Sequence, residues 1–211
     1  MKLGTYLVTD AGLSGERSTV EIVEAALDGG VDVVQLREKG TTARRRYELG
    51  RRLREMTRAT DATFVVNDRV DLALAVDADG VHLGDDDLPV AAARELLGPD
   101  AVVGRSVSTA EDARAAAEAG ADYLGVGAVF PTESKDTAPE RSGIGLDRVR
   151  AVTDAVDVPC VGIGGVTPDN AADVVAAGAD GVAVISAVTG ADDPAAATRA
   201  LGRAVEAGGH A

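Results

Sequence analysis

The stretch AAGADGVAVISA, residues 176–187, decides the fold, because it joins the end of a helix to a buried strand. Glycine is favoured just past a helix C-terminus, and Gly178 stands at that place. An Asp follows, and the run after it is rich in Val and Ile, as strands of parallel sheets are. The same order recurs in ALDGGVDVVQLRE (26–38), AVDADGVHLG (75–84) and AEAGADYLGVGAVF (117–130). This repeat predicts helices that alternate with parallel strands.

The repeat extends to eight expected strands, at about 5–9, 33–38, 63–67, 80–84, 102–107, 123–130, 160–165 and 181–187. The gaps between them are too long for hairpins, and only the helix at about 69–76 must be brief. Eight such units in 211 residues predict one α/β domain over 1–211, a parallel (β/α)₈ TIM barrel. Residues from about 205 to 211 are expected to form a flexible tail. A doubly wound sheet is the alternative, but it usually has G-x-G-x-x-G after its first strand, where this chain has DAGLSGERS.

Local signals mark where helices start. Ser18 with Glu21, and Ser108 with Glu111, are spaced as capping boxes. The pairs Thr167-Pro168 and Asp193-Pro194 place an N-cap residue before a proline at the first helical position. Each signal predicts a helix that begins at the next residue.

The charge of the chain is strongly acidic, with 35 Asp and Glu against 21 Lys and Arg, for a net charge of −14. This balance argues against nucleic acid or an acidic membrane as a partner, because binding phosphates needs clustered cations. An acidic, lysine-poor surface is halophile-like and predicts solubility in concentrated salt, where charge repulsion is screened. Only Lys2, Lys39 and Lys135 are lysines.

The location of the protein is expected to be cytoplasmic. No apolar run reaches the roughly 18–20 residues that a membrane span needs. The N-terminal apolar stretch is short for a signal peptide, and we interpret it as the first strand. The single cysteine, Cys160, lies in a strand-like run and is interpreted as a small buried hydrophobe.

Polar residues gather at the expected C-terminal ends of the strands, which is where barrel enzymes carry their active sites. In VVQLREKG (33–40), Gln35, Arg37 and Lys39 share one face, because residues two apart in a strand point the same way. The other strands end in or run into Asn67, Asp68, Asp87, Ser106, Thr132, Ser134, Lys135, Gly164, Gly165, Ile185 and Ser186.

These residues suggest two anion sites. Asp68 and Asp87 come from neighbouring strands, and carboxylates without His or Cys suit magnesium (Mg²⁺). Arg37, Lys39 and Lys135 would surround the same space, which predicts a diphosphate site. GIGG at 162–165 predicts a monophosphate site, although a tight turn explains it about as well. His82 is interpreted as structural, so no general base is evident, and displacement of pyrophosphate is the chemistry that fits.

At these positions the chain resembles the thiamine phosphate synthase family. The resemblance covers nearly the whole chain and rests on QLREK (35–39), ND (67–68), GVHLGDDDLP (80–89), Ser106 in GRSVST, FPTESK (130–135) and GIGG. It implies a transferase of thiamine biosynthesis that joins hydroxymethylpyrimidine diphosphate to thiazole phosphate. The products are thiamine phosphate and pyrophosphate. The displacement would be dissociative and assisted by Mg²⁺.

The resemblance also implies roles for individual residues. The pyrimidine diphosphate would be bound by Gln35, Arg37, Lys39, Asn67, Ser106 and Lys135, of which Arg37, Lys39, Ser106 and Lys135 are also assigned to catalysis. Asp68 and Asp87 would bind the metal, although Asp85 and Asp86 replace the Gln and Glu usual in the family. Thr132, Ser134, Gly164, Gly165, Ile185 and Ser186 would bind the thiazole phosphate. The loop 131–142 is expected to be a mobile lid.

Three alternatives are kept. A thiazole tautomerase would carry a catalytic His near SVST, which this chain lacks. A non-catalytic barrel that senses thiamine intermediates would have lost Asp68, Asp87 or Lys135, and all three are present. The third alternative is another phosphate-binding barrel, such as a sugar-phosphate aldolase or isomerase. An aldolase would need a Schiff-base lysine inside a strand, whereas Lys39 and Lys135 lie at or past the expected strand ends. A homodimer is one candidate assembly.

Overall fold

The computed structural model describes residues 1–132 and 142–209. Within this part, eight strands form a closed barrel, and each strand is parallel to both of its neighbours. They are β1 (Thr5–Val8), β2 (Val33–Leu36), β3 (Thr63–Asn67), β4 (Gly80–Leu83), β5 (Val102–Val107), β6 (Tyr123–Gly127), β7 (Cys160–Ile163) and β8 (Gly181–Val184). The predicted eight-stranded parallel barrel is therefore confirmed.

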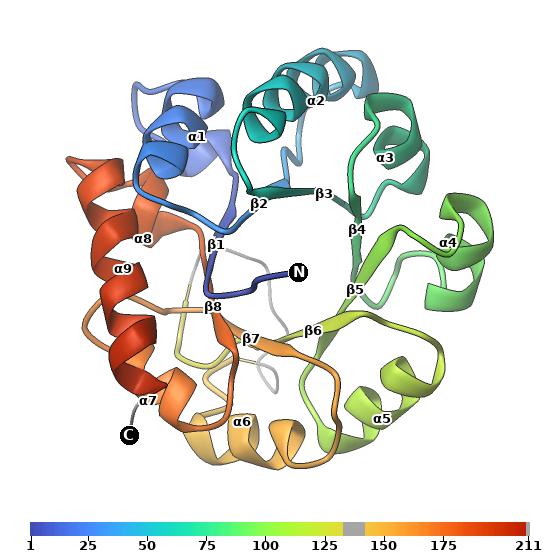
Figure 1. Cartoon of the computed structure of the whole chain (residues 1–211), viewed down its shortest axis with the longest axis vertical. Coiled ribbons are helices and arrows are strands. Elements are labelled where there is room, and N and C mark those ends of the chain that lie inside the picture. The colour runs from blue at the N-terminus through green and yellow to red at the C-terminus, as the bar shows by residue number, and fades with distance from the viewer. Residues whose placement is uncertain (133–141, 210–211) are drawn as a thin grey trace.

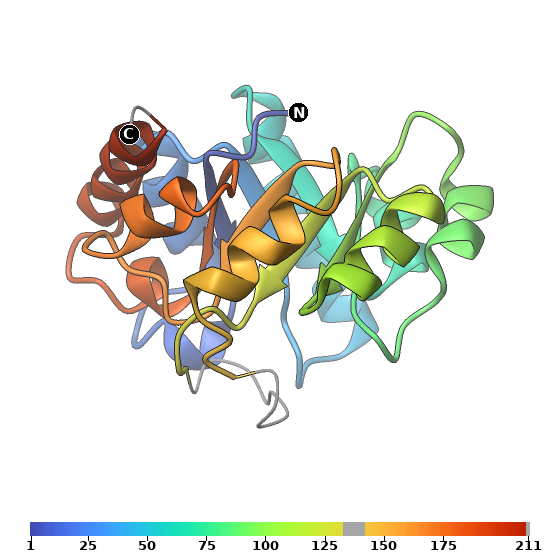
Figure 2. The same cartoon turned by 90° about the horizontal axis from the view of Figure 1, so that it is seen from below.

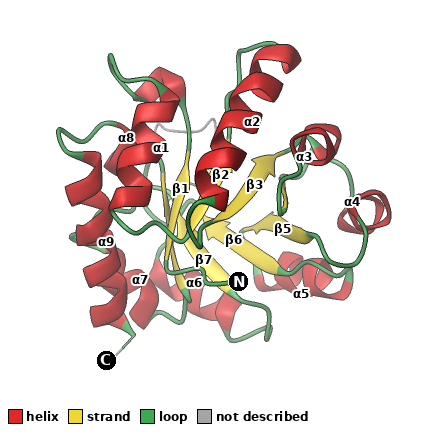
Figure 3. Ribbon diagram, turned by 45° about the horizontal axis from the view of Figure 1, so that its top comes forward, coloured by secondary structure: helices red, strands yellow, loops and turns green. Residues whose placement is uncertain are grey.

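Helices surround this barrel, as Figure 1 shows from one end and Figure 3 from an oblique angle. The chain enters the barrel at the end where the strands begin, near the N-terminus marked in Figure 2. The described helices are η1 (Ala11–Leu13), α1 (Thr19–Asp28), α2 (Ala43–Arg58), α3 (Val70–Val76), α4 (Val90–Leu97), α5 (Ala110–Glu118), α6 (Leu146–Thr153), α7 (Ala171–Ala176), α8 (Ser186–Thr189) and α9 (Pro194–Gly208). No helix in the described ranges is both long and apolar enough to cross a membrane.

Alternation along the strands divides the core in two. One set of side chains, including Leu7, Val34 and Phe64, packs outward against the helices. The next residues along, such as Tyr6, Val33 and Val65, form a separate cluster inside the barrel. This alternation is the period-two pattern of a strand, and it explains why both faces of these strands read as apolar.

The Asp of the sequence repeat has a structural role at the start of alternate strands. Before β4, the Asp79 backbone N–H donates to the Phe64 carbonyl (2.8 Å), and its carboxylate accepts from the Phe64 N–H (2.7 Å). The same pair of hydrogen bonds, which we call a bracket, joins Asp32 to Thr5, Asp122 to Val103 and Asp180 to Cys160. Each bracket ties an even-numbered strand to the odd-numbered strand before it, so the repeat fixes the register of strand pairs.

Two predictions at helix ends are wrong. Helix α9 continues to Gly208, which is buried, so residues 205–208 are helical rather than a flexible tail. The N-cap of α5 is Thr109, whose hydroxyl accepts from the Asp112 N–H, so the expected box of Ser108 and Glu111 is displaced by one residue. The box of Ser18 and Glu21 at α1 and the Asp193 cap at α9 are confirmed.

The pair Thr167-Pro168 is not the start of a helix either. Helix α7 begins at Ala171, after Asn170. The Asn170 side chain instead accepts from the Thr167 N–H (2.8 Å) and donates to the Gly165 carbonyl (3.1 Å). These bonds hold a turn between β7 and α7, and the helix starts only after that turn.

Candidate active site

A hollow of about 130 Å³ opens at the C-terminal ends of β5 to β8. Six residues that the sequence placed in the site line it: Ser106, Thr132, Gly164, Gly165, Ile185 and Ser186. The sequence analysis missed Gly127, Ala128 and Val166, which also line it. They had no polar side-chain atom to mark them, but their places at or just after the ends of β6 and β7 were the available signal.

The two glycines after β7 are required by the shape of the loop. Gly164 and Gly165 have φ angles of +100° and +61°. A Cβ on Gly164 would lie 2.4 Å from the Cβ of Ala128, and one on Gly165 would lie 2.7 Å from the Cβ of Phe130. The loop therefore turns tightly against the segment after β6, and its bare backbone faces the hollow.

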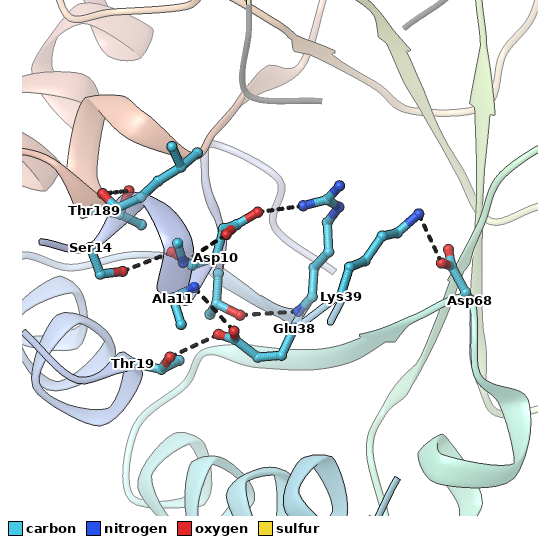
Figure 4. Close-up of polar contacts among 12 residues, drawn as sticks. Asp10, Ala11, Ser14, Thr19, Glu38, Lys39, Asp68 and Thr189 are labelled. Atoms are coloured by element: carbon cyan, nitrogen blue, oxygen red, sulfur yellow. Dashed lines mark hydrogen bonds and ion pairs between the residues drawn. The ribbon is translucent and has the colours of Figure 1, made fainter. Parts of the chain in front are cut away.

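The charged end of β2 contributes an anchored guanidinium. Arg37 follows the last residue of the strand and is buried, and its Nη1 donates to Asp10 Oδ2 at 2.7 Å. Its backbone N–H donates to the Thr9 hydroxyl (3.0 Å). These bonds come from the end of β1, so the loops after β1 and β2 hold the Arg37 side chain in place (Figure 4).

Glu38 is buried on the opposite side of this loop, away from Lys39. Its carboxylate accepts from the Thr19 hydroxyl (2.8 Å) in the first turn of α1 and from the Ala11 N–H (3.0 Å) in η1, as Figure 4 shows. The carboxylate thus fastens the β2 loop to two helical segments. Glu38 is therefore an anchor of the loop after β2.

Lys39 reaches the end of β3. Its Nζ lies 3.3 Å from Asp68 Oδ2, and its side chain is 61% exposed. Asp68 has a φ of 63°, a left-handed conformation that is uncommon for residues other than glycine. Asn67 ends β3 in register with His82 and is half-buried.

Asp68 and Asp87 interact, as their neighbouring strands predicted. Partial burial, together with the charge and hydrogen bonding of Asp68, raises the pKa of Asp87, although the Gly84 N–H (2.6 Å from Asp87 Oδ2) opposes the rise. Two carboxylates that repel each other beside solvent suit a hard divalent cation, and two protein ligands leave positions for water or substrate oxygens. Among the described residues no group of three or more His, Cys, Asp and Glu forms a fuller metal cage.

The choice of Asp87 within the run of three Asp fits the structure. Asp85 turns to Arg105, whose Nη2 donates to Asp85 Oδ1 at 2.8 Å. Asp86 is exposed. Asp87 is therefore the residue of the three whose carboxyl group meets that of Asp68.

Gln35 and Ser106 stand at opposite ends of a chain of buried side chains. Gln35 Nε2 donates to the Tyr6 hydroxyl at 2.6 Å, and the Tyr6 and Tyr123 hydroxyls are 2.7 Å apart. His82 lies 2.9 Å from the Tyr123 hydroxyl and 2.9 Å from Ser106 Oγ. The histidine predicted to be structural is thus hydrogen-bonded at both ring nitrogens and lies next to the hollow through Ser106.

Three further expectations concern single residues or lie outside the described part. Cys160 is buried, and burial raises the pKa of its thiol to about 12, which agrees with a small unreactive hydrophobe. Ser134 and Lys135 lie outside the described residues, as does most of the predicted lid at 131–142. Ile185 precedes α8, and Ser186 is its first residue.

A (β/α)₈ barrel with a carboxylate pair, cations and a glycine-lined hollow at the C-terminal ends of its strands has the architecture and the site position of a TIM-barrel enzyme. Within that class, the chain belongs to the thiamine monophosphate synthase family, whose sequence pattern matches residues 5–188. It is a transferase.

Individual relatives agree over nearly the full length. The chain is 69% identical to the thiamine-phosphate synthase of Natronomonas pharaonis, covering 96% of this chain and 95% of the relative. It is 57% identical to that of Moorella thermoacetica, with 93% and 92% covered. A solved structure, thiamine phosphate pyrophosphorylase from Pyrococcus furiosus, superposes with a TM-score of 0.89 at 47% identity and covers 97% of this chain and 96% of that one.

Proposed function

We propose that this chain joins hydroxymethylpyrimidine diphosphate to thiazole phosphate, releasing pyrophosphate and forming thiamine phosphate. One observation carries the proposal. A carboxylate pair with cations lies on one side of the barrel mouth, and a glycine-lined hollow lies on the other. Two phosphorylated substrates need two such sites, and the names of the relatives point to this pair.

The side formed by β2, β3 and β4 suits the diphosphate. Arg37, Lys39, Asn67 and Lys135 would bind it, and Asp68 and Asp87 would hold Mg²⁺. The metal would neutralise charge on the leaving pyrophosphate. Arg37 is anchored by Asp10 and Lys39 is drawn toward Asp68, so both cations are positioned by neighbouring carboxylates.

The side formed by β7 and β8 suits the thiazole phosphate. The backbone of Gly164 and Gly165 lines the hollow together with Ile185 and Ser186. Phosphate oxygens accept hydrogen bonds from exposed backbone N–H groups, and glycine permits their close approach. Thr132 and Ser134 would contact the same ligand from the segment after β6.

The reaction would proceed by dissociative displacement. The C–O bond of the pyrimidine methylene breaks, and its electron pair leaves with the pyrophosphate. The lone pair of the thiazole nitrogen then forms the new C–N bond. The main contribution of Arg37, Lys39 and Lys135 would be electrostatic stabilisation of the departing anion, with Ser106 and Gln35 holding the pyrimidine.

A coupling assay with both substrates tests this function. Wild-type protein with Mg²⁺ is expected to form thiamine phosphate, and EDTA is expected to abolish turnover. Lys135→Ala should lower kcat/KM by about 100-fold, which is the typical cost of losing one group that stabilises a developing anion. Lys2→Ala is the matched control, because Lys2 pairs with Asp32 at the other end of the barrel and is 81% exposed. Full turnover in EDTA, or equal activity of the two variants, would contradict the proposal.

The setting of the enzyme is part of the proposal. Its partners would be the two small-molecule substrates rather than nucleic acid, it would work in the cytoplasm, and a homodimer is the candidate assembly. The net charge of −14 supports the exclusion of polyanions.

A further inference from the structure

Five side chains that cross the barrel interior form a hydrogen-bonded series: Gln35, Tyr6, Tyr123, His82 and Ser106. The series begins at β2, passes through β1, β6 and β4, and ends at β5 beside the hollow. Gln35, Tyr6, Tyr123 and His82 are almost completely buried. None of the middle three has a role in the proposed chemistry, so their function is open.

The barrel makes room for this series at two glycines. A Cβ on Gly104 would lie 2.1 Å from the Tyr123 ring and 2.5 Å from its hydroxyl oxygen. A Cβ on Gly125 would lie 3.1 Å from Cε1 of His82. Side chains on β5 and β6 are therefore absent at the two places where the phenol and the imidazole must pass.

The protons in the series can be followed from the Gln35 end. Gln35 Nε2 donates to the Tyr6 oxygen, and the order in which every buried donor then has an acceptor directs the Tyr6 proton to Tyr123. In that order the Tyr123 hydroxyl donates to Nδ1 of His82, and the imidazole proton lies on Nε2 and is donated to Ser106 Oγ. The Ser106 proton remains for the hollow. Burial raises the pKa of both tyrosines, so each keeps the proton that this order requires.

The other end of the series presents the opposite polarity. Gln35 Oε1 is buried and has no hydrogen-bond partner among the described residues. A buried acceptor without a donor is unfavourable, so this oxygen is suited to a donor on a ligand. The two ends thus offer one acceptor, on Gln35, and one donor, on Ser106. Exchanging donor for acceptor at one end requires reversing the direction of every hydrogen bond between the two ends.

We propose that Tyr6, Tyr123 and His82 are positioning residues that couple the hydrogen-bonding direction of Gln35 to that of Ser106. A pyrimidine that contacts both ends then meets one acceptor, on Gln35, and one donor, on Ser106, so the site favours a ring with one donor and one acceptor at these places over a ring with two acceptors. The pyrimidine of thiamine carries such groups, an amino group and ring nitrogens. This inference rests on the proposed function, because that function supplies the pyrimidine.

Discrimination between two substrates tests whether Gln35 and Ser106 are linked in this way. The formation of the joined product is measured with the aminopyrimidine diphosphate and with an analogue in which methoxy replaces the amino group, so that the ring presents two acceptors. Wild-type protein is expected to favour the amino substrate. Tyr123→Phe keeps the ring but cuts the series, so the Gln35 amide can turn without reversing Ser106. The ratio of kcat/KM values should therefore fall by about ten-fold or more in this variant.

Controls separate this inference from general damage and from the proposed function. Tyr6→Phe interrupts the series at another hydrogen bond and should lower the ratio of kcat/KM values for the amino and methoxy substrates in the same way. Tyr47→Phe, on α2 and 40% exposed, should leave the ratio unchanged. An unchanged ratio in both Tyr6→Phe and Tyr123→Phe would overturn the inference, whereas absence of coupling by the wild type would overturn the proposed function instead.

A measurement without turnover tests the proton order directly. In protein labelled with ¹⁵N at histidine, His210→Gln removes the other histidine signal. His82 should give the signature of one neutral tautomer protonated at Nε2, and Tyr123→Phe should shift or mix it. A tautomer protonated at Nδ1, or an imidazolium, in the otherwise unaltered protein would overturn the inference.

Discussion

Glu38 stands between two cations in VVQLREKG, yet the structure directs it away from both. Its carboxylate is buried and accepts from the Thr19 hydroxyl and the Ala11 N–H. Arg37 and Lys39 instead meet Asp10 and Asp68. Three consecutive charged residues therefore serve two purposes, since Glu38 fixes the loop while its neighbours face the barrel mouth.

Removing the Glu38 carboxylate should weaken the fold. Glu38→Ala leaves the Ala11 N–H and the Thr19 hydroxyl without their acceptor, at a cost of about 2–3 kcal/mol of unfolding free energy. Urea denaturation measures this value. Glu48→Ala is the matched control, because Glu48 is exposed and pairs only with Arg44 four residues away among its described partners, so it should change stability by less than about 0.5 kcal/mol. Equal midpoints for the two variants would contradict the anchoring role.

Whether a contact between two residues could be predicted from the sequence depends on whether their spacing along the chain follows a recognisable pattern. The proximity of Asp68 and Asp87 could be predicted because each follows a strand and neighbouring strands end together. The contact of Glu38 with Thr19 joins residues 19 apart, and that of Tyr6 with Tyr123 joins residues 117 apart. Neither pair has a spacing that marks it, so the buried series inside the barrel required the structure.

At the scale of elements, the Asp that precedes each even-numbered strand holds that strand against the one before it. Each carboxylate and N–H together bracket one residue of the preceding strand. The repeat was visible in sequence and sufficed to predict parallel strands, but the bracket was not, because its partner lies in the neighbouring strand. Strand ends were predicted up to three residues too long, with the largest excess at β6 and β8, because the apolar runs that predicted these strands continue past their last paired residues.

The bracket at Asp79 should contribute measurably to stability. It accepts from the Phe64 N–H and also binds both terminal nitrogens of Arg54, at 2.9 and 2.7 Å. Asp79→Ala leaves a backbone donor and a largely buried guanidinium without their acceptor. We therefore expect the unfolding free energy to fall by about 2–4 kcal/mol. Asp79→Asn keeps one acceptor and should lose less.

Thermal unfolding followed by circular dichroism measures both Asp79 variants. Asp61→Ala serves as the control, because Asp61 is exposed and lies just before the same strand, β3. The bracket would lose its assigned role if Asp79→Ala melted at the temperature of the control.

At the scale of the whole molecule, acidic charge and a cationic site occur together. Only three of the 21 basic residues are lysines, and two of these, Lys39 and Lys135, belong to the proposed diphosphate site. The ammonium is a compact point charge that a planar guanidinium does not reproduce. Lysine is thus scarce over the chain but present at both positions where the anion would bind.

The net charge of −14 should make stability depend on salt. Repulsion among surface carboxylates opposes the compact state, and salt shortens the screening length from about 30 Å at 0.01 M to about 3 Å at 1 M. The unfolding midpoint should therefore rise from low salt to molar KCl. Four exposed residues, Glu24, Glu55, Glu95 and Glu118, can be replaced with Gln to remove four negative charges. This variant should show a smaller difference in unfolding midpoint between low salt and molar KCl. Sucrose at matched osmolality separates screening from solute exclusion. Equal midpoints in low and high KCl would show that the acidic surface does not limit the stability of this barrel.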